Sequence, residues 1–158
     1  MTAFRKGGTV LGKGDSIPYV TLVDDDGASV ALTSLIDRPI VLYFYPKDDT
    51  PGCTAEACRF RDEYEAFVDA GADVIGVSSD GAQSHARFRE RHRLPFRLMS
   101  DPGGAARKAF GIPATFGILP GRATFVIARD AKILYSFNSQ FAPHQHVQRA
   151  LSAVRGQA

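Results

Sequence analysis

An uninterrupted run of apolar and aromatic residues extends from Ile40 to Tyr45. Such a run is typical of a strand that is buried on both faces, in a sheet covered by helices. Pro46 follows and cannot donate to a sheet ladder, and the residues after it include several turn formers: Asp48, Asp49, Pro51 and Gly52. The pattern therefore predicts a central strand that ends in a tight loop.

A helical pattern begins at Thr54, directly after this loop. Apolar residues recur there at three- and four-residue steps, namely Ala57, Phe60, Tyr64, Phe67 and Val68. We expect this helix to run to about Ala70 and to end at Gly71, because glycine is favoured at helix C-termini. Cys53 is thus predicted to lie where the loop enters the first turn of the helix.

Strands and helices alternate through the rest of the chain. Short runs rich in apolar and β-branched residues predict strands at 19–22, 29–32, 73–78, 97–99, 122–128 and 132–138, of which the first two and the last two form hairpins. Helical patterns occupy 33–36, 83–93, 104–110 and 144–155. We expect the helix over 83–93 to be capped near Ser79 or Asp80. This order predicts an α/β fold, with a central mixed sheet flanked by helices.

Composition agrees with one globular domain over residues 1–158, in which residues 1–9 are loosely ordered. The chain is 44% hydrophobic and 23% charged, and no apolar run approaches the roughly 20 residues that span a bilayer. The N-terminus has no signal-peptide pattern. We therefore expect no membrane association and a cytoplasmic location.

The net charge of +2 is only a weak bias. The densest basic stretch, at 87–93, is interpreted as a solvated helix face rather than a nucleic-acid site. Three successive aspartates at 24–26 stand among turn formers. Since the spacing and the bidentate glutamate of a calcium loop are missing, we interpret them as a solvated turn.

Candidate chemistry centres on Cys53. The unpaired N–H groups and the positive dipole end of a helix N-terminus favour an anion, and the thiolate is the reactive form of cysteine. A free cysteine can also be simply a small buried hydrophobe, so position alone leaves both interpretations open. Two neighbours favour chemistry: the hydroxyl of Thr50 could hydrogen-bond the sulfur or a bound oxygen, and Pro46 could shield the sulfur from water.

The segment from Tyr43 to Cys58 resembles the active-site segment of peroxiredoxins, in particular the bacterioferritin-comigratory or PrxQ group. The family pattern Pro-x-x-x-Thr-x-x-Cys falls on Pro46, Thr50 and Cys53, and the family's arginine at the start of a later strand falls on Arg122. The resemblance extends over nearly the whole chain. It implies a thioredoxin-like fold with an N-terminal β-hairpin extension, and a thiol-dependent peroxidase.

The resemblance also implies roles for these residues. Cys53 would attack the peroxide, and Arg122 would hold the thiolate and hydrogen-bond the peroxide oxygens. Thr50 and the N–H groups around Gly52 would add donors as charge develops. Glu56 could orient Arg122 by an ion pair, or could only complement the helix dipole; the sequence leaves both open.

Cys58 is the candidate resolving thiol, which would form an intramolecular disulfide with the Cys53 sulfenic acid. Five residues along an ideal helix separate Cα atoms by about 8.7 Å, whereas a disulfide usually needs less than about 7 Å. The first helical turns must therefore unwind. Alternatively, Cys58 is a buried helix residue and a partner thiol resolves the sulfenic acid. The resemblance implies thioredoxin or a glutaredoxin system as reductant, a monomer, and no metal or organic cofactor.

Two other classes remain open. A thioredoxin-like disulfide oxidoreductase would have Cys-x-x-Cys, whereas this chain has four residues between its cysteines. The triplet Ala-Thr-Phe also occurs twice, at 114–116 and 123–125, and we prefer the second copy as the strand because its apolar run is longer. A copper-binding redox chaperone could use both cysteines with a histidine from His85, His144 or His146.

The chain departs from the family pattern at Ala131. The family usually has glycine there, in the turn of the second hairpin. Only the local geometry of that turn is affected.

Overall fold

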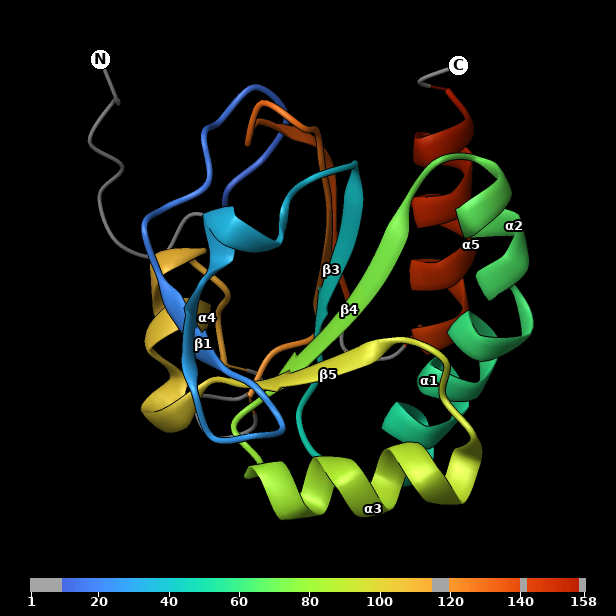
Figure 1. The fold of residues 1–158 in the computed structure, drawn as a ribbon. Helices are drawn as coiled ribbons and strands as arrows, with labels where there is room; N and C mark the ends of the chain where they lie inside the picture. Colours follow the sequence, from blue (N-terminus) through green and yellow to red (C-terminus); the bar gives the residue numbers. More distant parts are fainter. Residues whose placement is uncertain (1–9, 115–119, 140–141, 157–158) are drawn as a thin grey trace.

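A seven-stranded mixed sheet forms the centre of the molecule, in the strand order β2-β1-β5-β4-β3-β6-β7 (Figure 1). The computed structural model describes residues 10–114, 120–139 and 142–156. The strands are β1 (Thr21–Val23), β2 (Ser29–Ala31), β3 (Ile40–Phe44), β4 (Asp73–Ser78), β5 (Arg97–Ser100), β6 (Ala123–Ile127) and β7 (Ile133–Asn138). The helices are η1 (Leu32–Leu35), α1 (Pro51–Asp62), α2 (Tyr64–Asp69), α3 (Ala82–His92), η2 (Pro102–Gly104), α4 (Ala105–Ala109) and α5 (Pro143–Arg155).

The β3 strand is an inner strand of the sheet, between β4 and β6. It pairs in parallel with β4 and antiparallel with β6, and all five of its residues are buried. Helices cover both of its faces, which is why the run lacks polar alternation. The predicted α/β fold with a mixed sheet, flanking helices and an N-terminal hairpin is confirmed.

Alternate β3 residues point into two separate cores. Val41 and Tyr43 pack with apolar residues of α1, α2, α3 and α5 on one face. Leu42 and Phe44 pack with α4 and η1 on the other. Figure 1 shows the same division, with α1, α2 and α5 on one side of the sheet and α4 on the opposite side.

Helix boundaries differ from the predictions in three places. The helix expected from Thr54 begins at Pro51, because proline is favoured in the first turn, and it is interrupted at Glu63 to give α1 and α2. The helix predicted over 104–110 is shorter and follows the η2 turn.

The predicted cap of the third helix is also wrong. Gly81 is the N-cap residue of α3, and it provides no side-chain cap. The carboxylate of Asp80 instead accepts hydrogen bonds from Ser78 and from the backbone N–H of Asp48. A tertiary contact has therefore replaced a local one.

The structure explains two turns that the sequence singled out, the one with three aspartates at 24–26 and the one at Ala131. Asp24 accepts the N–H groups of Asp26 and Ala28, so the acidic stretch is organised as a turn. Ala131 adopts a left-handed conformation, with φ of 67°. Alanine can occupy this conformation at a cost of roughly 1–2 kcal/mol, and glycine would relieve it.

The loose order expected over residues 1–9 lies outside the described residues, as does most of the first Ala-Thr-Phe triplet, at 114–116. Within the described residues, no helix is long and apolar enough to cross a bilayer.

Candidate active site

The loop between β3 and α1 places Cys53 at the start of a helix. Thr50 is the N-cap residue of α1, Pro51 is the first helical residue, and Asp49 has a left-handed backbone with φ of 61°. Cys53 therefore lies in the first turn, as the sequence predicted. Its side chain is buried, with 1% of its surface exposed.

The Thr50 hydroxyl does not cap the helix. It donates a hydrogen bond of 2.8 Å to the carbonyl of Lys47. Two consequences follow. The first-turn N–H groups of α1, including those of Gly52 and Cys53, keep their capacity to bind an anion or an oxygen. With its hydrogen engaged, the hydroxyl offers a lone pair to a neighbouring O–H group, rather than the donor that the family resemblance implies.

Arg122 directly precedes β6, and its side chain contacts Cys53. Its Nη2 lies 3.4 Å from the Cys53 Sγ. The antiparallel pairing of β6 with β3, in register at Phe44 and Ala123, brings Arg122 beside the end of β3. The guanidinium is nearly buried, with 4% exposed, so its charge acts on the sulfur with little solvent screening.

Glu56 forms a buried ion pair with Arg122. The Arg122 Nη1 lies 2.5 Å from the Glu56 Oε1. Of the two roles left open by the sequence, the geometry therefore selects orientation of Arg122. Burial raises the pKa of Glu56 to about 8 even though Arg122 opposes the shift. Burial by itself would lower the pKa of Arg122, but Glu56 and Cys53 outweigh it and raise that pKa.

A pocket of about 410 Å³ opens over the Cys53 sulfur. It is lined by Pro46, Lys47, Thr50, Gly52, Cys53, Pro120 and Arg122. Pro46, Thr50, Gly52 and Arg122 are therefore brought together around Cys53, as the sequence predicted. Glu56 pairs with Arg122 outside this lining, and Cys58 does not line the pocket either. Lys47 and Pro120 were missed, although Lys47 stands within the recognised motif.

Gly52 has a steric reason to be glycine. A Cβ atom at this position would lie 3.2 Å from the Nη2 of Arg122, which is tighter than an ordinary contact. The absence of a side chain therefore lets the guanidinium approach the sulfur.

Cys58 lies five residues further along α1. It is partly buried, and both cysteines are free thiols in this structure. The two thiols therefore belong to one intact helix, and direct contact between them requires the helical turns to open.

The histidines considered for copper have other partners. His85 lies 2.7 Å from an oxygen of Asp48, and His146 hydrogen-bonds Thr124 and the carbonyl of Ser139. His144 is exposed. Across the described ranges, the three aspartates at 24–26 form the one cluster of potential metal ligands, and it contains neither cysteine nor histidine.

His146 completes the surroundings of the Glu56–Arg122 pair. Its Nδ1 lies 3.9 Å from the Glu56 Oε2 and 2.7 Å from the Thr124 hydroxyl, and its Nε2 lies 2.7 Å from the Ser139 carbonyl. Because a carbonyl only accepts, Nε2 carries the hydrogen, and Nδ1 of the neutral ring accepts from Thr124. Sequence reasoning assigned no such role to His146, since its spacing from Glu56 gives no signal.

The buried His146 should make stability depend on pH. Burial lowers its pKa to about 4 from an ordinary 6.5, so the unfolded chain binds a proton that the folded chain does not. Stability is then fully present above pH 6.5 and is lost as the pH falls toward 4, by up to about 3 kcal/mol. Urea unfolding at pH 7 and pH 4 should show this loss diminished in His146→Gln. An equal loss in both proteins would contradict the assignment.

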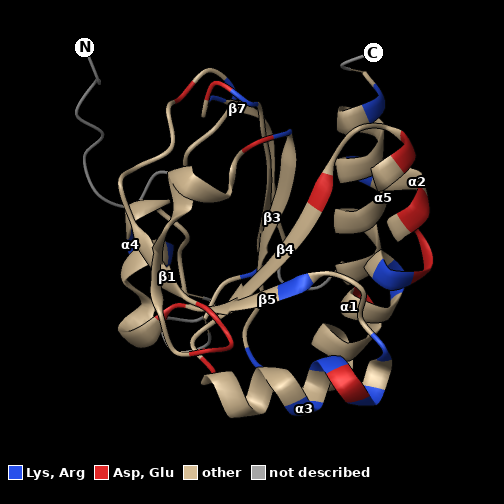
Figure 2. Ribbon diagram, viewed as in Figure 1, with Lys and Arg blue, Asp and Glu red and all other residues tan. Residues whose placement is uncertain are grey.

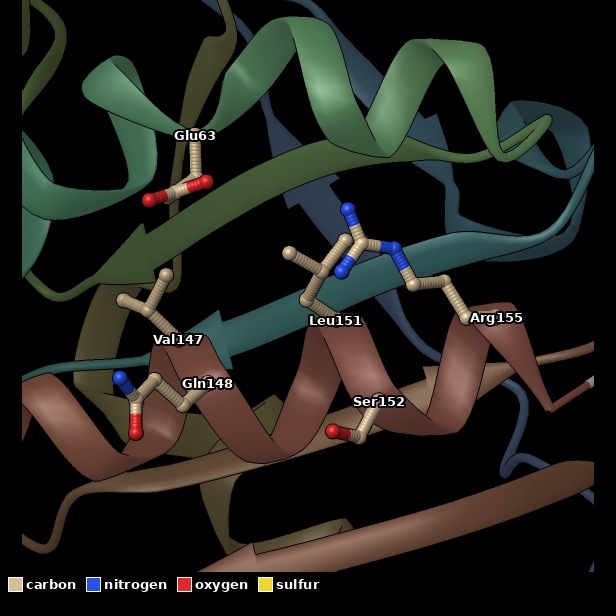
Figure 3. Close-up of a pocket in the computed structure, with 6 residues that line it drawn as sticks. All are labelled: Glu63, Val147, Gln148, Leu151, Ser152 and Arg155. Atoms are coloured by element: carbon tan, nitrogen blue, oxygen red, sulfur yellow. The ribbon is translucent and has the colours of Figure 1, made fainter.

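A second pocket, of about 330 Å³, lies between α5 and the junction of α1 and α2 (Figure 3). Its lining consists of Glu63, Val147, Gln148, Leu151, Ser152 and Arg155. It contains no thiol and shares no residue with the Cys53 pocket. Of these two pockets, the larger one, of about 410 Å³ over Cys53, is therefore the one that contains a candidate nucleophile.

Known proteins of similar sequence belong to the family that the motif around Cys53 resembles. The sequence pattern of the AhpC/TSA family matches residues 13–136. Peroxiredoxin Q of Oryza sativa subsp. japonica, a chloroplastic protein, is 48% identical over 146 residues, which cover 92% of this chain and 67% of the relative.

Solved structures show the same fold. The peroxidoxin BcpB of Mycobacterium tuberculosis has a TM-score of 0.85 and 36% identity, with 94% of this chain and 99% of that chain covered. The bacterioferritin comigratory protein of Xanthomonas campestris, described for its alkyl peroxide reduction activity, has a TM-score of 0.76 and 28% identity, with 87% and 91% covered.

The thioredoxin-like fold, the helix-terminal cysteine with its arginine, and these relatives together define a thiol peroxidase. The chain belongs to the AhpC/TSA family, and its relatives place it in the peroxiredoxin Q or bacterioferritin-comigratory group. The resemblance found in the sequence is confirmed.

Proposed function

We propose that this protein reduces hydrogen peroxide and organic hydroperoxides through Cys53. The observation that carries the proposal is the 3.4 Å contact between the Arg122 guanidinium and the Cys53 sulfur, at a helix N-terminus beneath an open pocket. Such a place favours a thiolate, which is the nucleophile required to break an O–O bond.

The first step is a displacement on oxygen. The Cys53 thiolate attacks one peroxide oxygen, the S–O bond forms as the O–O bond breaks, and the second oxygen leaves as hydroxide or alkoxide and takes a proton. Cys53 is oxidised by two electrons to a sulfenic acid, and the peroxide is reduced to water or an alcohol.

The pocket residues supply complementary contacts for this step. Arg122 and the N–H groups of Gly52 and Cys53 can donate to the oxygens as negative charge develops. Thr50 can accept the O–H of the incoming peroxide, because its own hydrogen is bound to Lys47. Pro46 lines the pocket and limits the access of water to the sulfur.

The range of substrates follows from the size and openness of the pocket. The pocket volume of about 410 Å³ is larger than a molecule of hydrogen peroxide and leaves room for an alkyl substituent. The alkyl peroxide reduction described for the Xanthomonas campestris relative supports the inclusion of organic hydroperoxides.

Cys58 is proposed as the resolving thiol. It attacks the sulfenic sulfur of Cys53, an S–S bond forms, and the sulfenic oxygen leaves as water. The first turns of α1 must unwind for this step, as the helix geometry requires. Thioredoxin, or a glutaredoxin system, then reduces the disulfide through a mixed disulfide, and both thiols are restored.

Mass spectrometry after one equivalent of hydrogen peroxide tests this route. The native protein should lose two hydrogen atoms as the Cys53–Cys58 disulfide forms. Cys58→Ser should instead gain one oxygen on Cys53 and remain there as sulfenic acid. Wild-type protein that also stops at sulfenic acid would show that a partner thiol, rather than Cys58, resolves it.

The two other classes are separated by one further assay. Metal-free protein should consume peroxide with thioredoxin as the electron source. Insulin reduction without peroxide consumption would favour the disulfide oxidoreductase, and a requirement for added copper would favour the copper chaperone.

A further inference from the structure

The loop between β3 and α1 carries a buried carboxylate that the peroxide chemistry does not use. Asp48 points inward between two exposed neighbours, Lys47 and Asp49, and only 4% of it is exposed. A carboxylate this deeply buried requires compensation by several donors. Its surroundings therefore indicate what the loop is attached to.

Three side-chain donors converge on Asp48. Tyr45 donates to its Oδ1 at 2.5 Å, while Ser84 and the His85 Nδ1 lie 2.8 Å and 2.7 Å from its Oδ2. Burial would raise the pKa of Asp48, but the hydrogen bonds from His85, Tyr45 and Ser84 outweigh it and lower that pKa. The carboxylate thus stays charged and His85 donates to it from Nδ1.

Both remote donors come from the first turns of α3. Figure 1 shows α3 beneath the end of the sheet where β3 leads into α1. The other end of α3 holds the same loop, because Arg91 pairs with Asp49 at 2.8 Å. Figure 2 shows residues of both charge signs along this helix. The attachment through Asp48 is buried, whereas that through Asp49 is exposed and weaker.

We propose that Asp48 and His85 are positioning residues for peroxide reduction: they fix the 46–50 loop on α3, so that Pro46 and Thr50 stay aligned with Cys53. This inference rests on the proposed function. If α1 unwinds in each cycle, the loop cannot rely on α1 for its position. Asp48 and His85 both lie outside the segment between the two cysteines, so their contact is kept while that segment opens.

The rate of the first oxidation step tests the proposal, measured by stopped flow in a Cys58→Ser background. His85→Ala should lower the second-order rate constant with hydrogen peroxide by roughly tenfold to a hundredfold, the size expected from a small misplacement of reacting groups. His85→Asn, whose amide can replace the Nδ1 donor, should recover most of that loss. The thiolate absorbance of Cys53 should not change, because the Arg122 contact does not pass through the loop.

A matched pair of tyrosines provides the control. Tyr45→Phe removes one donor to Asp48, and Tyr64→Phe removes one donor to Asp73, at 2.8 Å, on the far α2 side. The first should slow oxidation and the second should not, although both delete a single hydroxyl. Equal rates for Tyr45→Phe and Tyr64→Phe, or no recovery in His85→Asn, would overturn the positioning role. A Cys58→Ser background that fails to react at all would refute the proposed function instead.

Discussion

Cys53→Ser should reduce peroxide turnover to the uncatalysed background, a loss on the order of 10⁶-fold, which is the lower end of enzymic rate enhancements. A serine hydroxyl is not ionised at neutral pH and cannot form a sulfenic acid, so both the nucleophile and the intermediate disappear. Steady-state consumption of hydrogen peroxide with thioredoxin measures the loss.

Cys58→Ser is the natural control for this variant. It also replaces a cysteine sulfur by a serine oxygen, five residues along the same helix. This variant should still react once with peroxide, because Cys53 is intact. The fold should tolerate Cys53→Ser, because the substitution is nearly isosteric in a polar niche beside Arg122. Residual multiple turnover in Cys53→Ser, with Cys58 intact, would show that the other thiol performs the chemistry.

Arg122→Gln should lower the rate constant for Cys53 oxidation by about 10²- to 10³-fold, the loss that follows removal of one preorganised donor to a developing oxyanion. The variant removes the charge 3.4 Å from the sulfur together with the donors to the peroxide. The fraction of Cys53 present as thiolate at neutral pH should fall as well. Stopped-flow oxidation and ultraviolet thiolate absorbance measure the two effects separately.

Removal of Arg122 also leaves the buried Glu56 carboxyl without its partner, and an unpaired buried polar group can destabilise a fold even when it is neutral. The double variant Arg122→Gln/Glu56→Gln removes that carboxyl group and serves as the control. If the double variant regains the wild-type oxidation rate, the loss in Arg122→Gln arose from the unpaired Glu56 carboxyl. Arg122→Lys should show an intermediate rate, because it keeps the charge and loses the planar fork of donors.

Much of the site could be predicted from the sequence because it is local. The buried strand, the loop of turn formers and the helical spacing after it are all encoded within about 30 residues, and they suffice to place Cys53 at a helix N-terminus. Arg122 is 69 residues away, and only the resemblance to peroxiredoxins indicated it.

Other contacts in and around the site could not be predicted, because the local sequence does not reveal the tertiary partner of a polar side chain. The sequence leaves two roles open for Glu56 in the first helical turn, because its pairing with Arg122 depends on how β6 lies against β3. The sequence predicts a helix cap at Ser79 or Asp80, but the Asp80 carboxylate accepts from the loop N–H of Asp48 and the hydroxyl of Ser78. A turn-forming or capping residue has the same local preference whether its side chain faces water or a neighbouring element.

The order of strands and helices, the reactive helix terminus and the family were thus determined by the sequence itself, through short-range periodicity, turn chemistry and a recognisable motif. Only the tertiary structure decided which polar groups are paired inside the protein: Glu56 with Arg122, Asp48 with His85, and His146 with Thr124 and Ser139. The Glu56–Arg122 and His146–Thr124 pairs join residues 66 and 22 positions apart. The contact of His146 with Ser139 joins a helix side chain to the backbone just after β7. Burial makes an unpaired polar group costly and strengthens the contact between paired ones, and no single segment of the chain determines which groups are buried together.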